Sequence, residues 1–207
     1  MKASLPNTTD EKTSVLAFIS QLEHHIRESS KIDNELQIYQ EGINYLTNPT
    51  ILFDTKVRIL FLFLQLFPYH PQLYYFMGWI HQIKHQENAP TTTDQENRDE
   101  TVPSISLYWY GEALKHFSLF RNHQKQIHPY EIENWLDLFK CLFESNCTKK
   151  IQEYLDSYKS TIDDYVKNKD VRMIHFLGAF YIKTNQLKKA NAMYQTILDP
   201  SFPKDQE

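Results

Sequence analysis

The residues of this chain whose types and spacing could support chemistry are a histidine pair and a cysteine pair. His81 and His85 lie four residues apart in a segment of helical character, so they could share one helix face and bind zinc. The metalloprotease signature His-Glu-x-x-His needs a glutamate after the first histidine, but Gln82 stands there and cannot act as a base. Cys141 and Cys147 have no matching second pair. We therefore expect no catalytic residue, no metal site and no cofactor.

Glycine is scarce, with four residues among 207. A Rossmann Gly-x-Gly turn, a phosphate-binding Gly-rich loop and a Gly-x-Ser-x-Gly elbow therefore cannot be assembled. Catalytic triads cannot be recognised from spacing, because their members meet only in space. Together with the helical character of the chain, this favours a protein that is not an enzyme.

The bulk composition limits the partners and the compartment. A formal net charge of −4 gives no reason to expect nucleic-acid binding, which usually requires a basic face. Residues 115–128 mix bases with aromatics, but they are better interpreted as the end of a buried helix whose C-terminal dipole the bases complement. The longest apolar run, residues 59–67, is far shorter than the roughly 20 residues of a membrane span. The N-terminus lacks a signal-peptide core, and two cysteines suit a reducing compartment. We expect a cytoplasmic protein without direct membrane insertion.

Apolar residues recur at spacings of three and four along most of the chain, as at Val15, Phe18, Ile19 and Leu22. Prolines lie between these runs, where they suit the start of a helix or the position past its end. No run alternates as a strand does. The sequence predicts an all-α fold of about nine helices, at 11–28, 33–47, 51–67, 71–85, 104–119, 129–144, 148–167, 171–184 and 187–199.

The polar segments predict the domain organisation. Residues 1–10 and 201–207 are expected to be flexible ends, and residues 11–200 a single helical domain. Residues 86–102 have almost no apolar content and are expected to form a mobile loop. This loop is either a tolerated insertion or a segment that binds a partner.

The last two predicted helices carry a repeat pattern. Counting from residue 171, Gly178 falls at position 8, Tyr181 at 11, Ala190 at 20 and Tyr194 at 24. This resembles the tetratricopeptide repeat, in which small residues at such positions let two helices approach closely. The resemblance implies an antiparallel helix-pair array with a divergent N-terminal part.

Less regular copies of the same pattern precede the last pair. A second copy, counted from residue 71, places Gly78 at the position of Gly178 and continues after the polar segment with Tyr110 and Ala113. A degenerate copy begins near Ile132, and residues 37–70 form a weak fourth, in which Lys56 stands where a small residue is expected. The alternative is an irregular helical bundle with chance matches.

Aromatic residues around 74–79 and 108–110 exceed what one helix face can bury. In the repeat register, the concave surface would receive the candidate partner-binding residues Gln72, Tyr75, Trp79, Gln82, Arg172, His175 and Lys183, with Ala179 among them. Exposed Trp, Tyr and Arg are typical interface anchors. The alternative, which the residues leave open, is that tertiary packing buries these side chains.

The function that these features favour is protein binding. We expect a non-catalytic adaptor or chaperone that holds a helix or extended segment of a larger complex in a hetero-oligomer. In size, mild acidity, few cysteines and richness in Gln, Asn, His and Tyr, the chain is similar to the small virulence adaptors of intracellular bacteria. That resemblance implies a component of a bacterial type IV secretion coupling complex that helps to recruit effectors. The alternatives are a structural subunit of another assembly, or a secreted effector acting on host proteins.

Overall fold

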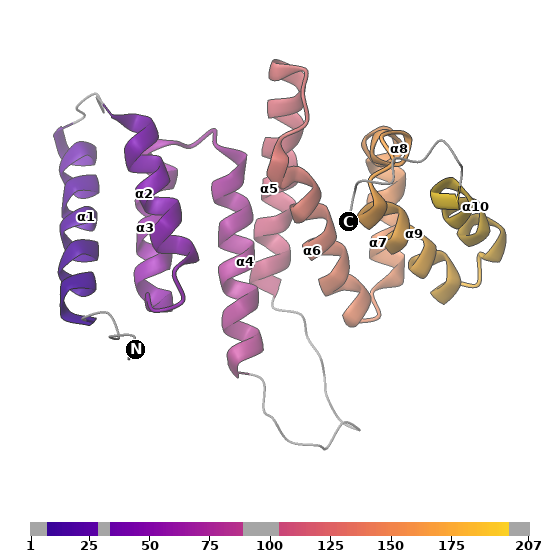
Figure 1. Ribbon diagram of the computed structural model, residues 1–207, viewed down its shortest axis with the longest axis horizontal. Helices are drawn as coiled ribbons and strands as arrows, with labels where there is room; N and C mark the ends of the chain where they lie inside the picture. The colour runs from indigo at the N-terminus through magenta and orange to yellow at the C-terminus, as the bar shows by residue number, and fades with distance from the viewer. Residues whose placement is uncertain (1–7, 29–33, 89–103, 199–207) are drawn as a thin grey trace, which may run out of the picture. The chain divides into compact units, whose positions relative to one another are not determined.

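The computed structural model describes residues 8–28, 34–88 and 104–198, and every element among them is an α-helix. The all-α helix-pair array predicted from the sequence is confirmed (Figure 1). The described residues form ten helices: α1 (Thr8–Glu28), α2 (Glu35–Thr47), α3 (Phe53–Leu66), α4 (Pro71–Asn88), α5 (Ser104–Gln124), α6 (Pro129–Glu144), α7 (Thr148–Ser157), α8 (Lys159–Lys167), α9 (Val171–Lys183) and α10 (Leu187–Leu198). None of them is long and apolar enough to cross a membrane.

The helices group into two compact units, residues 1–89 with α1 to α4 and residues 90–207 with α5 to α10. The boundary falls inside the segment predicted as a polar loop. Residues 86–88 of that segment belong to the end of α4, and the remainder lies outside the described residues. Of the two predicted flexible ends, residues 8–10 already form the first turn of α1, and the others also lie outside the described residues.

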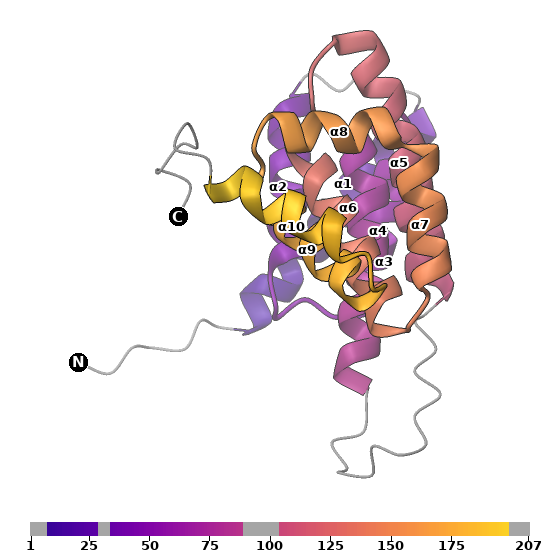
Figure 2. The same cartoon turned by 90° about the vertical axis from the view of Figure 1, so that its right-hand side faces the viewer.

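One predicted helix is two helices. The sequence predicts a single helix over 148–167, but α7 ends and α8 begins at Tyr158, whose φ of −115° departs from helical geometry. Figure 2 shows α8 running across the end of α7. The Tyr158 ring packs edge-on against Trp135 at 5.1 Å, and α8 turns to pack against α9. Contacts far away in the sequence therefore override a local pattern that is continuous.

The core of the N-terminal unit is built around α3, which packs against α1, α2 and α4. Phe63 of α3 is fully buried; its ring stacks on Tyr39 at 5.8 Å and meets Phe67 and Phe18 edge-on at 5.6 and 6.1 Å. A Cβ built on Gly42 of α2 would overlap the Phe63 ring. Gly42 therefore permits a close approach of α2 to α3 that the sequence pattern did not single out.

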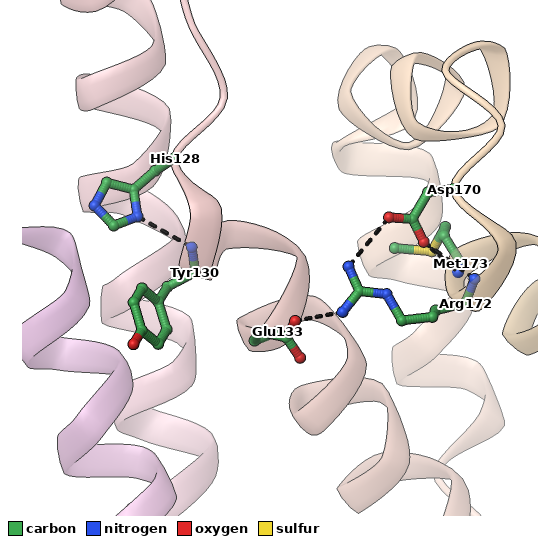
Figure 3. A network of polar contacts seen from close by, with 6 residues as sticks. All are labelled: His128, Tyr130, Glu133, Asp170, Arg172 and Met173. Carbon is green, nitrogen blue, oxygen red and sulfur yellow. Dashed lines mark hydrogen bonds and ion pairs between the residues drawn. The ribbon is translucent and has the colours of Figure 1, made fainter. Parts of the chain in front are cut away.

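The core of the C-terminal unit is built around α6, which packs against α5, α7 and α9. Trp135 is fully buried and lies 5.1 Å from the Phe139 ring and 6.2 Å from the Tyr154 ring. Helix α6 begins where Pro129 predicts, because His128 caps it: its Nδ1 accepts a hydrogen bond from the Tyr130 N–H at 3.2 Å (Figure 3).

The expected close contact between the last two helices is confirmed. A Cβ built on Gly178 of α9 would lie 2.5 Å from Cζ of Tyr194 in α10, and Ala190 of α10 is buried. Both residues stand where the repeat pattern requires small side chains.

The sharp turns of the C-terminal unit do not use glycine. Four helix ends place a non-glycine residue in the left-handed conformation, with φ of 54° to 57°, at Lys125, Asn146, Lys169 and Asn185. After the last three, an N–H bonds back to a carbonyl five residues earlier, from Cys147 to Leu142, from Asp170 to Tyr165 and from Gln186 to Tyr181. This is the Schellman arrangement, which satisfies carbonyls at a helix end. All four glycines are thereby left within helices.

The two cysteines differ in environment, which predicts one reactive thiol. Cys141 is buried in α6, and burial raises the pKa of its thiol to about 12, whereas Cys147 is exposed. Because the thiolate is the reacting species, a disulfide reagent at pH 8 is expected to modify one thiol in the native protein and two after denaturation. The Cys147→Ser variant is expected to lose the fast reaction. Rapid labelling of the native Cys147→Ser variant would show instead that α6 opens readily.

Candidate functional site

Among the predicted residues of α4, two are buried and two are accessible. Tyr75 is 7% exposed and Gln82 8% exposed. Both side chains are therefore buried by tertiary packing and are not part of an accessible binding surface. Gln72 is half-buried, and its Oε1 accepts a hydrogen bond from the Tyr39 hydroxyl at 3.1 Å, which ties α4 to α2. Trp79 is half-buried, with its ring edge-on to Phe76 at 5.9 Å. Trp79 is thus the predicted aromatic anchor of α4 that reaches the surface.

Trp79 lines a groove of about 470 Å³ in the N-terminal unit. One wall is the loop before α3 and the first turn of that helix, and the other wall is α4. We call it the Trp79 groove and define it by Leu52, Phe53, Lys56, Trp79, Ile83 and Lys84. Leu52 is 70% exposed although it is a large apolar residue, so the groove offers apolar surface to a ligand.

The rim of the Trp79 groove carries charge. Burial lowers the pKa of Lys56, against an opposing influence of Glu87. The Lys84 ammonium lies over the Phe53 ring, 5.8 Å from its centroid. The same ring meets His81 edge-on at 5.2 Å, so the half-buried His81 is a packing residue, and burial lowers its pKa. Two lysines and one glutamate give the groove a small positive charge beside its apolar floor.

The predicted residues of α9 divide between two neighbours. Arg172 forms ion pairs with Glu133 of α6 and, at 3.3 Å, with Asp170 (Figure 3). Asp170 caps α9 by accepting from the N–H groups of Arg172 and Met173 at 3.1 Å. At the other end of the helix, Lys183 donates to the Phe143 carbonyl at 3.1 Å. Arg172 and Lys183 therefore fasten α9 to α6.

Between Arg172 and Lys183, aromatic side chains make the contact of α9 with α6. Phe176 stacks on Phe139 with ring centroids 5.0 Å apart and meets Phe143 at 6.0 Å. His175 is exposed and lies 6.3 Å from the Tyr194 ring of α10, so it belongs to another side of α9. Phe176 lies on the same side of α9 as Arg172 and Lys183, although the repeat register did not select it as a partner-binding residue. Its spacing of four residues from Arg172 could have indicated this shared helix face.

A partly buried polar cluster joins three helices of the C-terminal unit. Arg121 of α5 lies 2.8 Å from Glu131 of α6 and 3.1 Å from Asp164 of α8, and its guanidinium lies over the Tyr165 ring at 5.7 Å. Glu131 is 3% exposed, and burial raises its pKa despite the nearby Arg121. Arg121 lies in the last turn of α5, where the sequence predicts the bases of residues 115–128, and it also pairs with acids from two other helices.

No constellation for metal or redox chemistry appears in the part of the chain that the structure describes. No three His, Cys, Asp or Glu side chains there lie close enough together to hold a metal ion. Comparison of the chain with protein-family models, with curated proteins and with solved structures finds no match. The class of protein is therefore defined by the fold alone, as an all-α array of packed helix pairs.

Proposed function

We propose that this chain is a non-catalytic protein-binding adaptor or chaperone that holds an apolar segment of its partner in the Trp79 groove. The observation that carries the proposal is an accessible apolar groove containing a tryptophan, with Leu52 standing 70% exposed at its edge. Exposed apolar patches of this kind typically mark binding sites, and tryptophan is enriched among the residues that dominate binding energy.

The partner segment is best described as amphipathic with acidic flanks. Its apolar side chains would replace water over Leu52 and Trp79, and its carboxylates would lie beside Lys56 and Lys84. Either a helix or an extended strand satisfies this description.

The groove is tested by a charge placed at its edge. Leu52→Lys is expected to weaken partner capture at least tenfold, because a solvated ammonium replaces an apolar contact. The matched control is Leu16→Lys in α1 of the same unit, at a residue that is 59% exposed and outside the groove. Partner capture by the tagged variants would be measured by purification from extracts of the native source, followed by mass spectrometry. In a separate experiment, a photo-crosslinker at position 52 or position 16 of the otherwise unchanged chain would show which position contacts the partner.

Both variants are expected to keep the wild-type circular-dichroism melt, because the replaced side chains are solvent-exposed. Equal capture by the two variants, or equal crosslinking from the two positions, would refute the groove as the binding site. A monomer with no partner but with substrate turnover would refute the adaptor function itself.

The finer proposal is that the complex is a bacterial type IV secretion coupling complex, in which the chain helps to recruit effectors. The overall character of the sequence supports it, as a small, mildly acidic, cysteine-poor helical protein. Purification of the tagged chain from its native source is expected to yield a coupling ATPase and small chaperones in fixed stoichiometry. A fixed set of proteins unrelated to secretion would assign a structural subunit instead.

A further inference from the structure

A second hollow lies in the C-terminal unit, between α5 and α7. It has a volume of about 420 Å³ and is lined by one face of α5, by α7 and by the residue that follows α7. We call it the tyrosine pocket and define it by Tyr108, Gly111, Lys115, Lys150, Tyr154 and Tyr158. It shares no residue with the Trp79 groove, and no part of the proposed function uses it.

Gly111 has no role in helix packing that would explain it. A Cβ built there would meet only the Tyr154 hydroxyl, at an ordinary contact distance of 3.7 Å. Glycine inside a helix is less stable than alanine there. At Gly42 and Gly178 a neighbouring ring requires the glycine, but at Gly111 no such contact does so. The glycine instead leaves the floor of the pocket bare, where a ligand backbone can approach closely.

Packing against the core holds two tyrosines of the pocket, Tyr154 and Tyr158, in place. Tyr154 and Tyr158 are half-buried, and their rings pack edge-on against the fully buried Trp135, at 6.2 and 5.1 Å. Tyr108 on the opposite wall is 58% exposed. Tyrosines with fixed rings and accessible hydroxyls provide contact area at low entropic cost and can hydrogen-bond a peptide backbone.

The charges of the pocket favour an anion. Glu112 is already paired with Lys115 at 2.6 Å. Lys150 is exposed and forms no ion pair with any residue that the structure describes. It lies in the first turn of α7, which contains Lys149 and no acidic residue. Because the helix dipole disfavours cations at that end, these lysines lower helix stability, and an anionic partner would offset this cost.

We propose that the tyrosine pocket binds an extended, acidic segment of a protein partner, with the partner backbone over Gly111 and a carboxylate beside Lys150. A protein segment suits the pocket better than single-stranded nucleic acid. The pocket holds only two lysines and one of them is neutralised by Glu112, whereas a nucleic-acid groove needs a continuous basic track.

The test selects short random displayed peptides on the intact protein after counter-selection against the Gly111→Leu variant. A leucine at that position would fill the pocket from its floor. The recovered peptides are expected to be enriched in Asp and Glu. Synthesised with a fluorescent label, they are expected to bind at least tenfold more weakly to Gly111→Leu and to Lys150→Glu than to wild type, and more weakly at high salt.

Two matched variants complete the design. Gly111→Ala adds one methyl group where the partner backbone is expected to lie, so it is expected to weaken peptide binding, though less than Gly111→Leu does. It is expected to raise the urea midpoint, because within the protein the methyl group meets only the Tyr154 hydroxyl at 3.7 Å. Leu52→Lys, in the Trp79 groove, is expected to leave this binding unchanged, so failure of one site is distinguishable from failure of the other. Lys150 is exposed, so Lys150→Glu tests the pocket even if Gly111→Leu does not fold.

Three outcomes would overturn the proposal. They are the recovery of no peptide after counter-selection, a recovered pool without acidic enrichment, and equal binding to wild type and Lys150→Glu. Tight binding of a single-stranded oligonucleotide that Lys150→Glu abolishes would replace the peptide with a nucleic acid as the ligand.

Discussion

Gly42→Ala is expected to destabilise the N-terminal unit by about 1–2 kcal/mol, even though alanine is the better helix former. Alanine gains about 1 kcal/mol within a helix, but overpacking a core costs roughly 1–3 kcal/mol and more where the neighbours cannot move. Here the added methyl group would overlap the Phe63 ring. That ring is held by Tyr39, Phe67 and Phe18, so it cannot rotate without displacing other aromatic side chains.

The matched control for Gly42→Ala is the same substitution at Gly111, which is also inside a helix. It meets only the Tyr154 hydroxyl at 3.7 Å, and its effect is expected to have the opposite sign. Urea unfolding followed by circular dichroism would measure both variants. A Gly42→Ala protein as stable as wild type would mean that α2 and α3 lie further apart than the structure places them.

Glu131→Leu is expected to have the largest effect, a loss of about 3–5 kcal/mol from the C-terminal unit. The substitution removes the carboxylate 2.8 Å from Arg121, whose side chain is only 19% exposed. Asp164 at 3.1 Å remains, but it is half-exposed and cannot replace a buried partner. An incompletely paired guanidinium that is mostly shielded from water is therefore left where three helices meet. Thermal and urea unfolding of the C-terminal unit would measure the loss.

Two further variants separate this explanation from simple damage to α6. Glu133→Leu, two residues along the same helix, breaks a half-exposed pair with Arg172 and is expected to cost at most about 1 kcal/mol. The double variant Arg121→Met with Glu131→Leu removes both charges of the pair and is expected to recover most of the lost stability. A double variant no more stable than Glu131→Leu alone would show that the cost comes from packing and not from the unpaired charge.

Helix positions and helix ends could be predicted because they depend on neighbours in the sequence. The start of α6 follows from Pro129 and its cap at His128, and α9 begins after the capping Asp170. The contact between Gly178 and Tyr194 also followed from spacing, since it joins two helices connected by a short turn. These features arise from backbone sterics and from a repeat of three and four residues, both of which act over a few positions.

The rest was decided by contacts between residues far apart in the chain. The break at Tyr158 depends on Trp135, and Arg121 pairs with Asp164 at a sequence separation of 43 residues. The surplus of aromatics on α4 left open whether these side chains would be buried or reach the surface, and packing alone selected Tyr75 for burial and Trp79 for the groove.

The physical reason for this division lies in the range over which each signal acts. A helical period states which face of a helix is apolar, but not which neighbour covers that face or how completely. Leu52 and Lys56 join Trp79 only because α3 lies against α4, and Gly111 faces an open pocket only because α5 and α7 stand apart over α6. The sequence alone therefore determined an all-α array and the positions of its helices, and only tertiary packing determined which side chains remain available to a partner.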